Sequence, residues 1–245
     1  MRFVWLIALA ATLLARTPAA AGAPPPGVPV LMYHKVDPKT PSDAVGRSLT
    51  LEPAAFSAEL AWLRAHAIHT LTMNELADAL ARGDHPRNAV VLTFDDGYND
   101  AADVVTPILR KYGARASFYV SAGFVGDGRH ASWAKLRAMR AAGMEIGCHG
   151  THHLDLARIR PSDAAFEVRR CVAAVTAHLG RPTTYAYPAG KWNATTLVLM
   201  RRAGMKAALT ERWGTVATLA SPYTLPRRRV DRSTGLASFA ALATP

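Results

Sequence analysis

Two adjacent carboxylates, Asp95 and Asp96, stand at the end of an apolar run at residues 89–92 and directly before a glycine. An ionised carboxylate is costly to desolvate unless it is paired or bound to a cation. Two of them at the mouth of a buried strand therefore indicate a functional site rather than structural charge. About fifty residues later, His149 and His153 follow a second apolar, strand-like run.

Two imidazoles four residues apart, with a carboxylate from another strand, leave one coordination position for water or substrate. This is the pattern of a catalytic site that holds a single divalent metal ion. Zn²⁺ suits this set of nitrogen and oxygen ligands best, and Co, Ni and Fe also fit it. His-x-x-x-His alone is a weak pattern, but together with the aspartate pair it predicts a mononuclear metal hydrolase.

Short apolar runs alternate with amphipathic helical stretches along most of the chain. Pro53 and Pro161 are well placed to open two of the helices. The alternation predicts an α/β fold with a parallel sheet covered by helices, either open or closed as a barrel. The runs expected to form strands are 28–33, 68–71, 90–94, 117–120, 144–147, 183–187 and 206–210, with a weaker candidate at 223–230.

The polar clusters of the sequence follow different expected strands. In folds of this type the chemistry gathers at the carboxyl ends of the strands, so we expect all the clusters on one rim. They are His34 after 28–33, the aspartate pair after 90–94, the histidines after 144–147, and Tyr187-Pro188 at the end of 183–187.

Residues 1–21 have a basic start, an apolar run and a small-residue exit, which is typical of a secretory signal peptide. The run is short for a membrane span of roughly 20 residues, although an uncleaved anchor is an alternative. A Pro-rich linker is expected at 22–27 and a single catalytic domain at 28–245. We therefore expect a secreted or periplasmic protein, without stable membrane insertion once the signal is cleaved.

The chain is basic, with 29 Lys and Arg against 18 Asp and Glu and a net charge of +11. Cleavage after residue 21 would remove Arg2 and Arg16 and leave 27 against 18, a net charge of +9. An exported basic protein is expected to meet anionic envelope polymers rather than nucleic acid. Charge alone selects no substrate.

The only two cysteines, Cys148 and Cys171, leave a disulfide open. An oxidising compartment would allow them to pair, but sequence does not fix the geometry that a bridge requires. Cys171 also belongs to an apolar helical stripe, where a small buried thiol needs no special role.

Thr-Phe-Asp-Asp-Gly at 93–97, followed by Glu-Ile-Gly-Cys-His-Gly-Thr-His-His-Leu-Asp-Leu at 145–156, resembles the polysaccharide deacetylases, the NodB homology domain of carbohydrate esterase family 4. The likeness extends to the segments 29–34, 185–190 and 225–230, and so runs through nearly the whole chain after the leader. It implies a single-domain, distorted and incomplete (β/α) barrel of about seven parallel strands, with the metal in a groove at its top.

Position by position, the resemblance implies that Asp96, His149 and His153 are the metal ligands and that Asp95 is the general base. The base must be close enough to take a proton from the attacking water without coordinating the metal strongly. His34 is the expected general acid, because the subgroup with an early Met-Tyr-His element gives it that role and this chain lacks a late Leu-x-Leu-His. A structural histidine at a strand end is the alternative.

Two departures from the family pattern bear on the site. Gly150 stands where many members have Ser or Thr, so any hydrogen bond from that hydroxyl is missing. The segment 186–189 replaces an Arg-Pro-Pro-Tyr and lacks its arginine. Arg227 is expected to replace that arginine beside Asp95, although Arg228 and Arg229 compete for the position.

The same segment is expected to bind substrate through Tyr187, Pro188 and Ala189. The backbone N–H of Ala189 could face the oxyanion, since that role uses no side chain. Trp192 is the best candidate for stacking on a sugar ring.

Together these features predict an exported, monomeric, metal-dependent deacetylase that hydrolyses N-acetyl groups of an amino-sugar polysaccharide. Poly-N-acetylglucosamine is preferred slightly over peptidoglycan and chitin-like polymers, because of the early histidine and the Tyr-Pro-x-Gly loop. One alternative is an O-acetyl esterase or other amide hydrolase on the same fold. Another is a non-catalytic polysaccharide-binding module, against which the retention of Asp95 with all three ligands argues.

Overall fold

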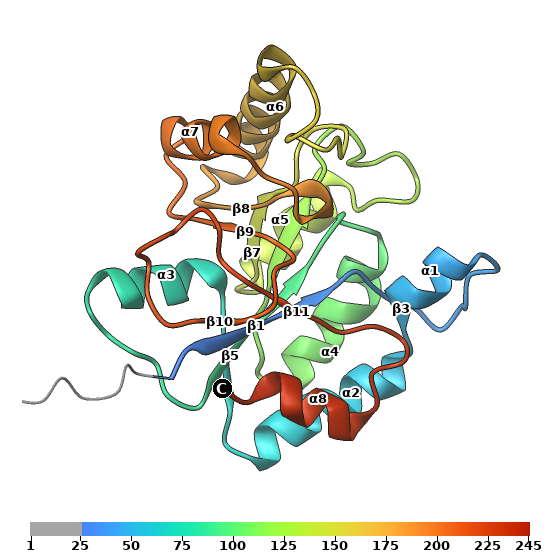
Figure 1. Cartoon of the computed structure of the whole chain (residues 1–245). Helices are drawn as coiled ribbons and strands as arrows, with labels where there is room; N and C mark the ends of the chain where they lie inside the picture. The colour runs from blue at the N-terminus through green and yellow to red at the C-terminus, as the bar shows by residue number, and fades with distance from the viewer. Residues whose placement is uncertain (1–25) are drawn as a thin grey trace, which may run out of the picture.

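The computed structural model describes residues 26–245, and a curled sheet covered by helices is its central feature (Figure 1). The expected signal peptide at 1–21 and most of the Pro-rich linker lie outside the described residues. The sheet has nine strands in the order β10-β1-β5-β6-β7-β8-β9, with β4 added beside β5 and β11 beside β1. Its strands are β1 (Val28–Tyr33), β4 (His69–Leu71), β5 (Ala89–Phe94), β6 (Ser117–Val120), β7 (Glu145–Cys148), β8 (Thr184–Ala186), β9 (Ala207–Leu209), β10 (Thr215–Val216) and β11 (Arg228–Arg229).

The path from β1 through β5 to β9 is parallel throughout, and only the short edge strand β10 pairs antiparallel. This confirms the predicted α/β fold of an incomplete, mostly parallel barrel. The run at 223–230 contributes only the two-residue strand β11. A second, two-stranded sheet joins β2 (Lys35–Val36) to β3 (Thr50–Leu51).

Local signals in the sequence begin several of the helices. Proline occupies the first turn of both α2 and α6, as predicted, and capping boxes open α3 and α7. The polar stretch before β3 contains a further helix, α1, which Asp43 caps. The helices are α1 (Ala44–Leu49), α2 (Pro53–Ala65), α3 (Met73–Ala81), α4 (Thr106–Lys111), α5 (Trp133–Ala141), α6 (Pro161–Leu179), α7 (Ala194–Arg202) and α8 (Leu236–Ala243), with single turns η1 (Ala101–Val105) and η2 (Pro188–Gly190).

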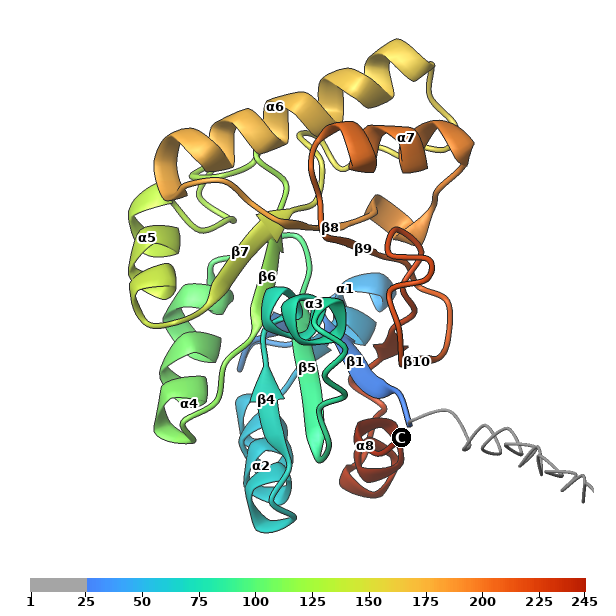
Figure 2. The same cartoon turned by 90° about the vertical axis from the view of Figure 1, so that its left-hand side faces the viewer.

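Figure 2 shows α6 and α7 lying together over β7, β8 and β9, while α2 and α8 pack together at the other end of the sheet. Among residues 26–245, no helix has the length and apolar character needed to cross a bilayer.

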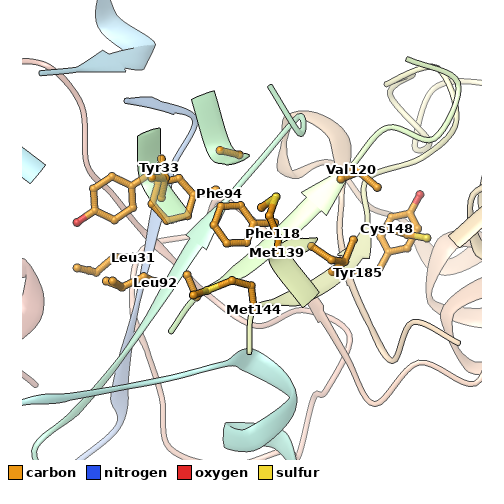
Figure 3. Packing of buried hydrophobic residues seen from close by; sticks show 14 of the residues in the cluster. Leu31, Tyr33, Leu92, Phe94, Phe118, Val120, Met139, Met144, Cys148 and Tyr185 are labelled. Atoms are coloured by element: carbon orange, nitrogen blue, oxygen red, sulfur yellow. The ribbon is translucent and has the colours of Figure 1, made fainter. Parts of the chain in front are cut away.

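The larger part of the core lies between the sheet and its covering helices. Tyr33, Phe94 and Phe118 stack across three neighbouring strands, with ring centroids 5.0 and 4.9 Å apart (Figure 3). Stacked pairs of this kind contribute about 0.5–1.5 kcal/mol beyond the area that they bury. Cys148 and Cys171 lie in the same core as free thiols. These contacts fix the strands that carry the polar rim.

The register of the parallel strands brings their polar successors to one edge. Tyr33 pairs with Phe94, and Val120 with Cys148. The residues that follow these positions, His34, Asp95 and His149, therefore leave the sheet at the same end. The predicted gathering of the polar clusters on one rim follows directly from this alignment.

Candidate metal centre

Asp96, His149 and His153 bring one ligand atom each to within 4.8 Å of the others. The Nε2 atoms of His149 and His153 lie 3.5 and 3.3 Å from Oδ1 of Asp96. Tetrahedral ligands at about 2.0–2.1 Å from Zn²⁺ are about 3.3 Å apart, so these separations fit one ion of that size. The mixed imidazole and carboxylate set is also the one that borderline divalent metals prefer.

The backbone aims two of these ligands. Asp96 has φ +70° and His153 has φ +54°, both in the left-handed region that residues other than glycine seldom adopt. Such conformations persist where the surrounding structure fixes them, and they cluster at functional sites. Here the left-handed backbone directs the side chains of both residues toward the same point on the rim.

His149 is oriented by its second ring nitrogen. Nδ1 lies 2.7 Å from the carbonyl oxygen of Ala186 at the end of β8. That nitrogen therefore carries the proton and donates it to the carbonyl, which leaves the lone pair of Nε2 directed at Asp96. A hydrogen bond of this kind is the usual partner of a metal-binding histidine.

Asp95 lies beside the three ligands but faces inward, where it forms a buried ion pair with Arg227. The two guanidinium nitrogens Nη1 and Nη2 each donate to one carboxylate oxygen at 2.8 Å. Burial alone would raise the pKa of Asp95, but the charge and hydrogen bonds of Arg227 hold it well below its usual range. Asp95 is therefore ionised at neutral pH.

Arg227 is itself fixed from two further sides. Nε donates to the carbonyl of Thr210 at 2.9 Å, and Nη1 also donates to Oγ1 of Thr93 at 3.2 Å. Of the three consecutive arginines, Arg227 is the one that the structure brings to Asp95. Arg228 instead donates to carbonyls at the end of α8, and Arg229 pairs with Glu211.

His34 follows β1 and lies next to Asp95, whose N–H donates to the carbonyl of Tyr33. Burial lowers the pKa of His34, while the negative charges of Asp95 and Asp96 act in the opposite direction. The charges of Arg229 and Arg227 add to the effect of burial, so the net shift of the His34 pKa is downward.

The predicted substrate-binding segment lies partly in the core. Tyr187 is fully buried, and its hydroxyl donates to the carbonyl of Tyr223 at 3.1 Å. Pro188 is also buried, and Trp192 is partly buried against the main core. The side chain of Tyr187 thus packs in the core. Ala189, with φ +52°, is the exposed residue of this turn.

Sequence reasoning missed two groups beside the metal centre. Tyr98 lies near Asp96, and burial followed by the charge of Asp96 raises the pKa of its hydroxyl to about 12. Its ring stacks on His130 at 5.0 Å. The second group is Glu167 on α6, which accepts hydrogen bonds from the backbone between the two histidine ligands. In the sequence, its position on the apolar stripe of the helix was the feature that could have identified Glu167.

The fold is an incomplete α/β barrel, and its rim brings together Asp96, His149 and His153, which could hold one metal ion. The sequence model of the polysaccharide deacetylase family matches residues 82–208, just over half of the chain. The chain therefore belongs to the polysaccharide deacetylase family, whose members are hydrolases that act on the amide bonds of N-acetyl groups.

Individual relatives match between about three quarters and nine tenths of the chain. The YxkH protein of Bacillus subtilis (strain 168) is 28% identical over 219 residues, covering 89% of this chain and 76% of its own. The poly-β-1,6-N-acetyl-D-glucosamine N-deacetylase of Staphylococcus aureus (strain MSSA476) is 24% identical over 74% of this chain and 68% of its own. Among solved structures, the Streptococcus pyogenes deacetylase PplD in complex with acetate superposes with a TM-score of 0.84, at 27% identity, over 90% of this chain and 100% of its own.

Proposed function

We propose that this chain is an exported, metal-dependent enzyme that removes N-acetyl groups from an amino-sugar polysaccharide. The observation that carries the proposal is the juxtaposition of an ionised, buried carboxylate, Asp95, with the three convergent ligands Asp96, His149 and His153. A binding module has no need for a base beside an open metal site. Poly-N-acetylglucosamine is the first substrate candidate, and the relative from S. aureus that acts on the β-1,6-linked polymer supports it. Peptidoglycan and chitin-like polymers follow.

Asp96, His149 and His153 would hold one divalent ion, with Zn²⁺ as the first choice and Co, Ni or Fe as alternatives. When bound, such an ion supplies a Lewis acid that polarises the acetamido carbonyl and activates water. The side chain of His153 is 39% exposed and that of Asp96 is 15% exposed. The site is therefore reached from solvent, as a polymeric substrate requires.

Asp95 would accept the proton of the attacking water. Arg227 contributes in two ways, because it keeps the carboxylate ionised and fixes the direction of its free lone pairs. A general base must lie within hydrogen-bond reach of the proton that it takes.

His34 would donate a proton to the departing amine from the other side. Its position directly after β1, on the same rim as Asp95, supports this role. The backbone N–H of Ala189 would face the developing oxyanion, since that role uses no side chain. Trp192 would contact the sugar beyond this turn.

The chain would act in the cell envelope or outside the cell as a monomer. The leader-like composition of residues 1–21 supports export, and residues 28–245 would form the catalytic domain after a short linker at 22–27. Its basic charge is consistent with an anionic envelope as its surroundings.

The test is acetate release from a panel of N-acetylated and O-acetylated glycans, with and without a chelator. The panel contains β-1,6-linked N-acetylglucosamine oligomers, chitin oligomers, peptidoglycan fragments and an O-acetylated sugar polymer. We expect chelator-sensitive acetate release and a free amine on an N-acetylated member. Release from the O-acetylated polymer alone would indicate an esterase, and metal binding without any release would indicate a binding module.

A further inference from the structure

The loop between the two histidine ligands is held from α6 by one buried side chain, Glu167. Its Oε2 accepts hydrogen bonds from the backbone N–H groups of Thr151 at 2.8 Å and His152 at 2.7 Å. Its Oε1 lies 2.7 Å from Nδ1 of His152. The main-chain carbonyl of Glu167 also accepts from the hydroxyl of Thr151 at 2.9 Å.

The burial of this carboxylate makes the contact specific. Glu167 is 2% exposed and lies on the buried stripe of α6 with Val168 and Cys171. A carboxylate in such a place is stable only when its oxygens are hydrogen-bonded, and hydrogen bonds to an ionised group are the stronger kind. The loop supplies those donors, so helix and loop each depend on the other.

Gly150 leaves room for this contact. It has φ +80°, and a Cβ atom built there would lie 3.3 Å from Oε2 of Glu167. In this chain the carboxylate of Glu167 supplies the acceptor for the turn.

We propose that Glu167 is a positioning residue that sets the second histidine ligand, His153, for metal binding. His149 is fixed by its own strand and by the carbonyl of Ala186. His153 instead follows a loop that contains the left-handed Gly150 and itself has φ +54°. Its placement therefore depends on what holds residues 151 and 152. The inference rests on the metal site of the proposed function.

The test measures zinc affinity by competition with a chromophoric chelator. For Glu167→Ala we expect the dissociation constant to rise roughly 10–100-fold, as for other groups that orient metal ligands. Glu167→Gln should lose much less zinc affinity, since its amide oxygen can still accept hydrogen bonds from both N–H groups. Glu167→Asp keeps the charge but is one methylene shorter, so it should resemble the alanine variant. In the metal-free protein, hydrogen exchange at Thr151 and His152 should speed up in E167A and E167D.

Glu145→Gln is the matched control. This half-buried carboxylate is the first residue of β7, whose other end leads to His149, and it accepts hydrogen bonds from the hydroxyls of Ser117 and Thr184 and from the backbone N–H of Asn74. Its replacement should lower stability without changing zinc affinity, because it lies at the opposite end of the strand.

The outcomes separate the inference from the proposed function. If the wild-type protein binds neither zinc nor another divalent ion, the proposed metal centre itself is contradicted. Wild-type binding with E167A and E167D within about twofold of it would overturn the role of Glu167 and leave the metal centre standing. If E167A does not fold, the zinc affinities of E167D and E167Q are compared instead. Equal affinities would contradict the proposal, because the shorter Asp side chain should not reach the loop whereas the Gln side chain should.

Discussion

Replacing Arg227 by alanine is expected to lower the free energy of unfolding of the metal-free protein by about 3–5 kcal/mol, because it leaves the Asp95 carboxylate buried without its partner. The side chains of Arg227 and Asp95 are 0% and 2% exposed, so solvent screening does not reduce this figure. Arg229 supplies the control. Its pair with Glu211 joins side chains that are 40% and 34% exposed, and Arg229→Ala should cost at most about 1 kcal/mol.

The pH dependence of this difference follows from the pKa of Asp95. In the wild-type protein, burial would raise the pKa, but Arg227 holds it below its ordinary value. The pair thus adds stability above the unfolded-state pKa of about 3.9 and loses it as the pH falls toward the folded-state value. In R227A burial acts without Arg227 and raises the pKa of Asp95. As the pH falls below this raised pKa, the carboxyl of Asp95 becomes protonated and its burial no longer destabilises the variant. The difference in the free energy of unfolding between the wild-type protein and R227A therefore shrinks by about 1.4 kcal/mol for each pH unit.

The assay is urea unfolding of metal-free protein, followed by tryptophan fluorescence between about pH 7 and about pH 4. The double variant D95N/R227A closes the cycle and isolates the interaction between the two side chains. Three results would refute the reasoning: a loss below about 1 kcal/mol in R227A, a loss independent of pH, or an equal loss in the D95N background.

Three further changes probe other parts of the molecule. Asp95→Asn should lower acetate release by about 10²–10⁴-fold with zinc affinity little changed, and an unchanged rate would exclude Asp95 as the base. Glu59 is buried against the hydroxyl of Tyr33, and burial raises its pKa to about 8. Because the unfolded chain ionises near pH 4.3, wild-type stability should fall as the pH rises from about 5 to about 8, and E59Q should flatten that slope in urea titrations; parallel slopes would contradict the raised pKa. Gly150→Ala should cost about 1–2 kcal/mol for its left-handed backbone and also weaken zinc binding. Gly83→Ala, at φ +81° with open space around the new Cβ, should show the backbone cost alone.

The centre of the sheet was predictable because strands such as β1, β5 and β6 are buried along their whole length. Near-continuous apolar runs such as 28–33 and 90–94 are typical of strands in the interior of a parallel sheet. Their alternation with helices along the chain allows only a few sheet topologies. The edge was less predictable. β10 and β11 have two residues each, and β11 is made of arginines whose strand character comes from pairing with β1 rather than from their own pattern.

The clustering of Asp96, His149 and His153 beside Asp95 was predictable because parallel strands bring the residues that follow them to one rim. The contacts around them were not, since they depend on side-chain direction across long stretches of chain. Nothing in the spacing of Tyr187 shows that its ring turns into the core, and nothing in the run of three arginines shows which one reaches Asp95. Glu167 lies 16 residues from Thr151 in sequence, and only the packing of α6 on β7 makes them neighbours.

The different environments of the two adjacent aspartates follow from the backbone between them. Asp95 continues the inward direction set by the end of β5 and meets a buried guanidinium. Asp96 enters the left-handed region at φ +70°, and Gly97 follows at φ +77°, so the chain reverses its direction within two residues. One carboxylate is thereby enclosed with a fixed cation, and its neighbour, which is 15% exposed, lies beside the buried His149 and the partly exposed His153. Two identical side chains acquire opposite environments through one turn, which is why a sequence of Asp-Asp-Gly at a strand end can provide a base and a ligand together.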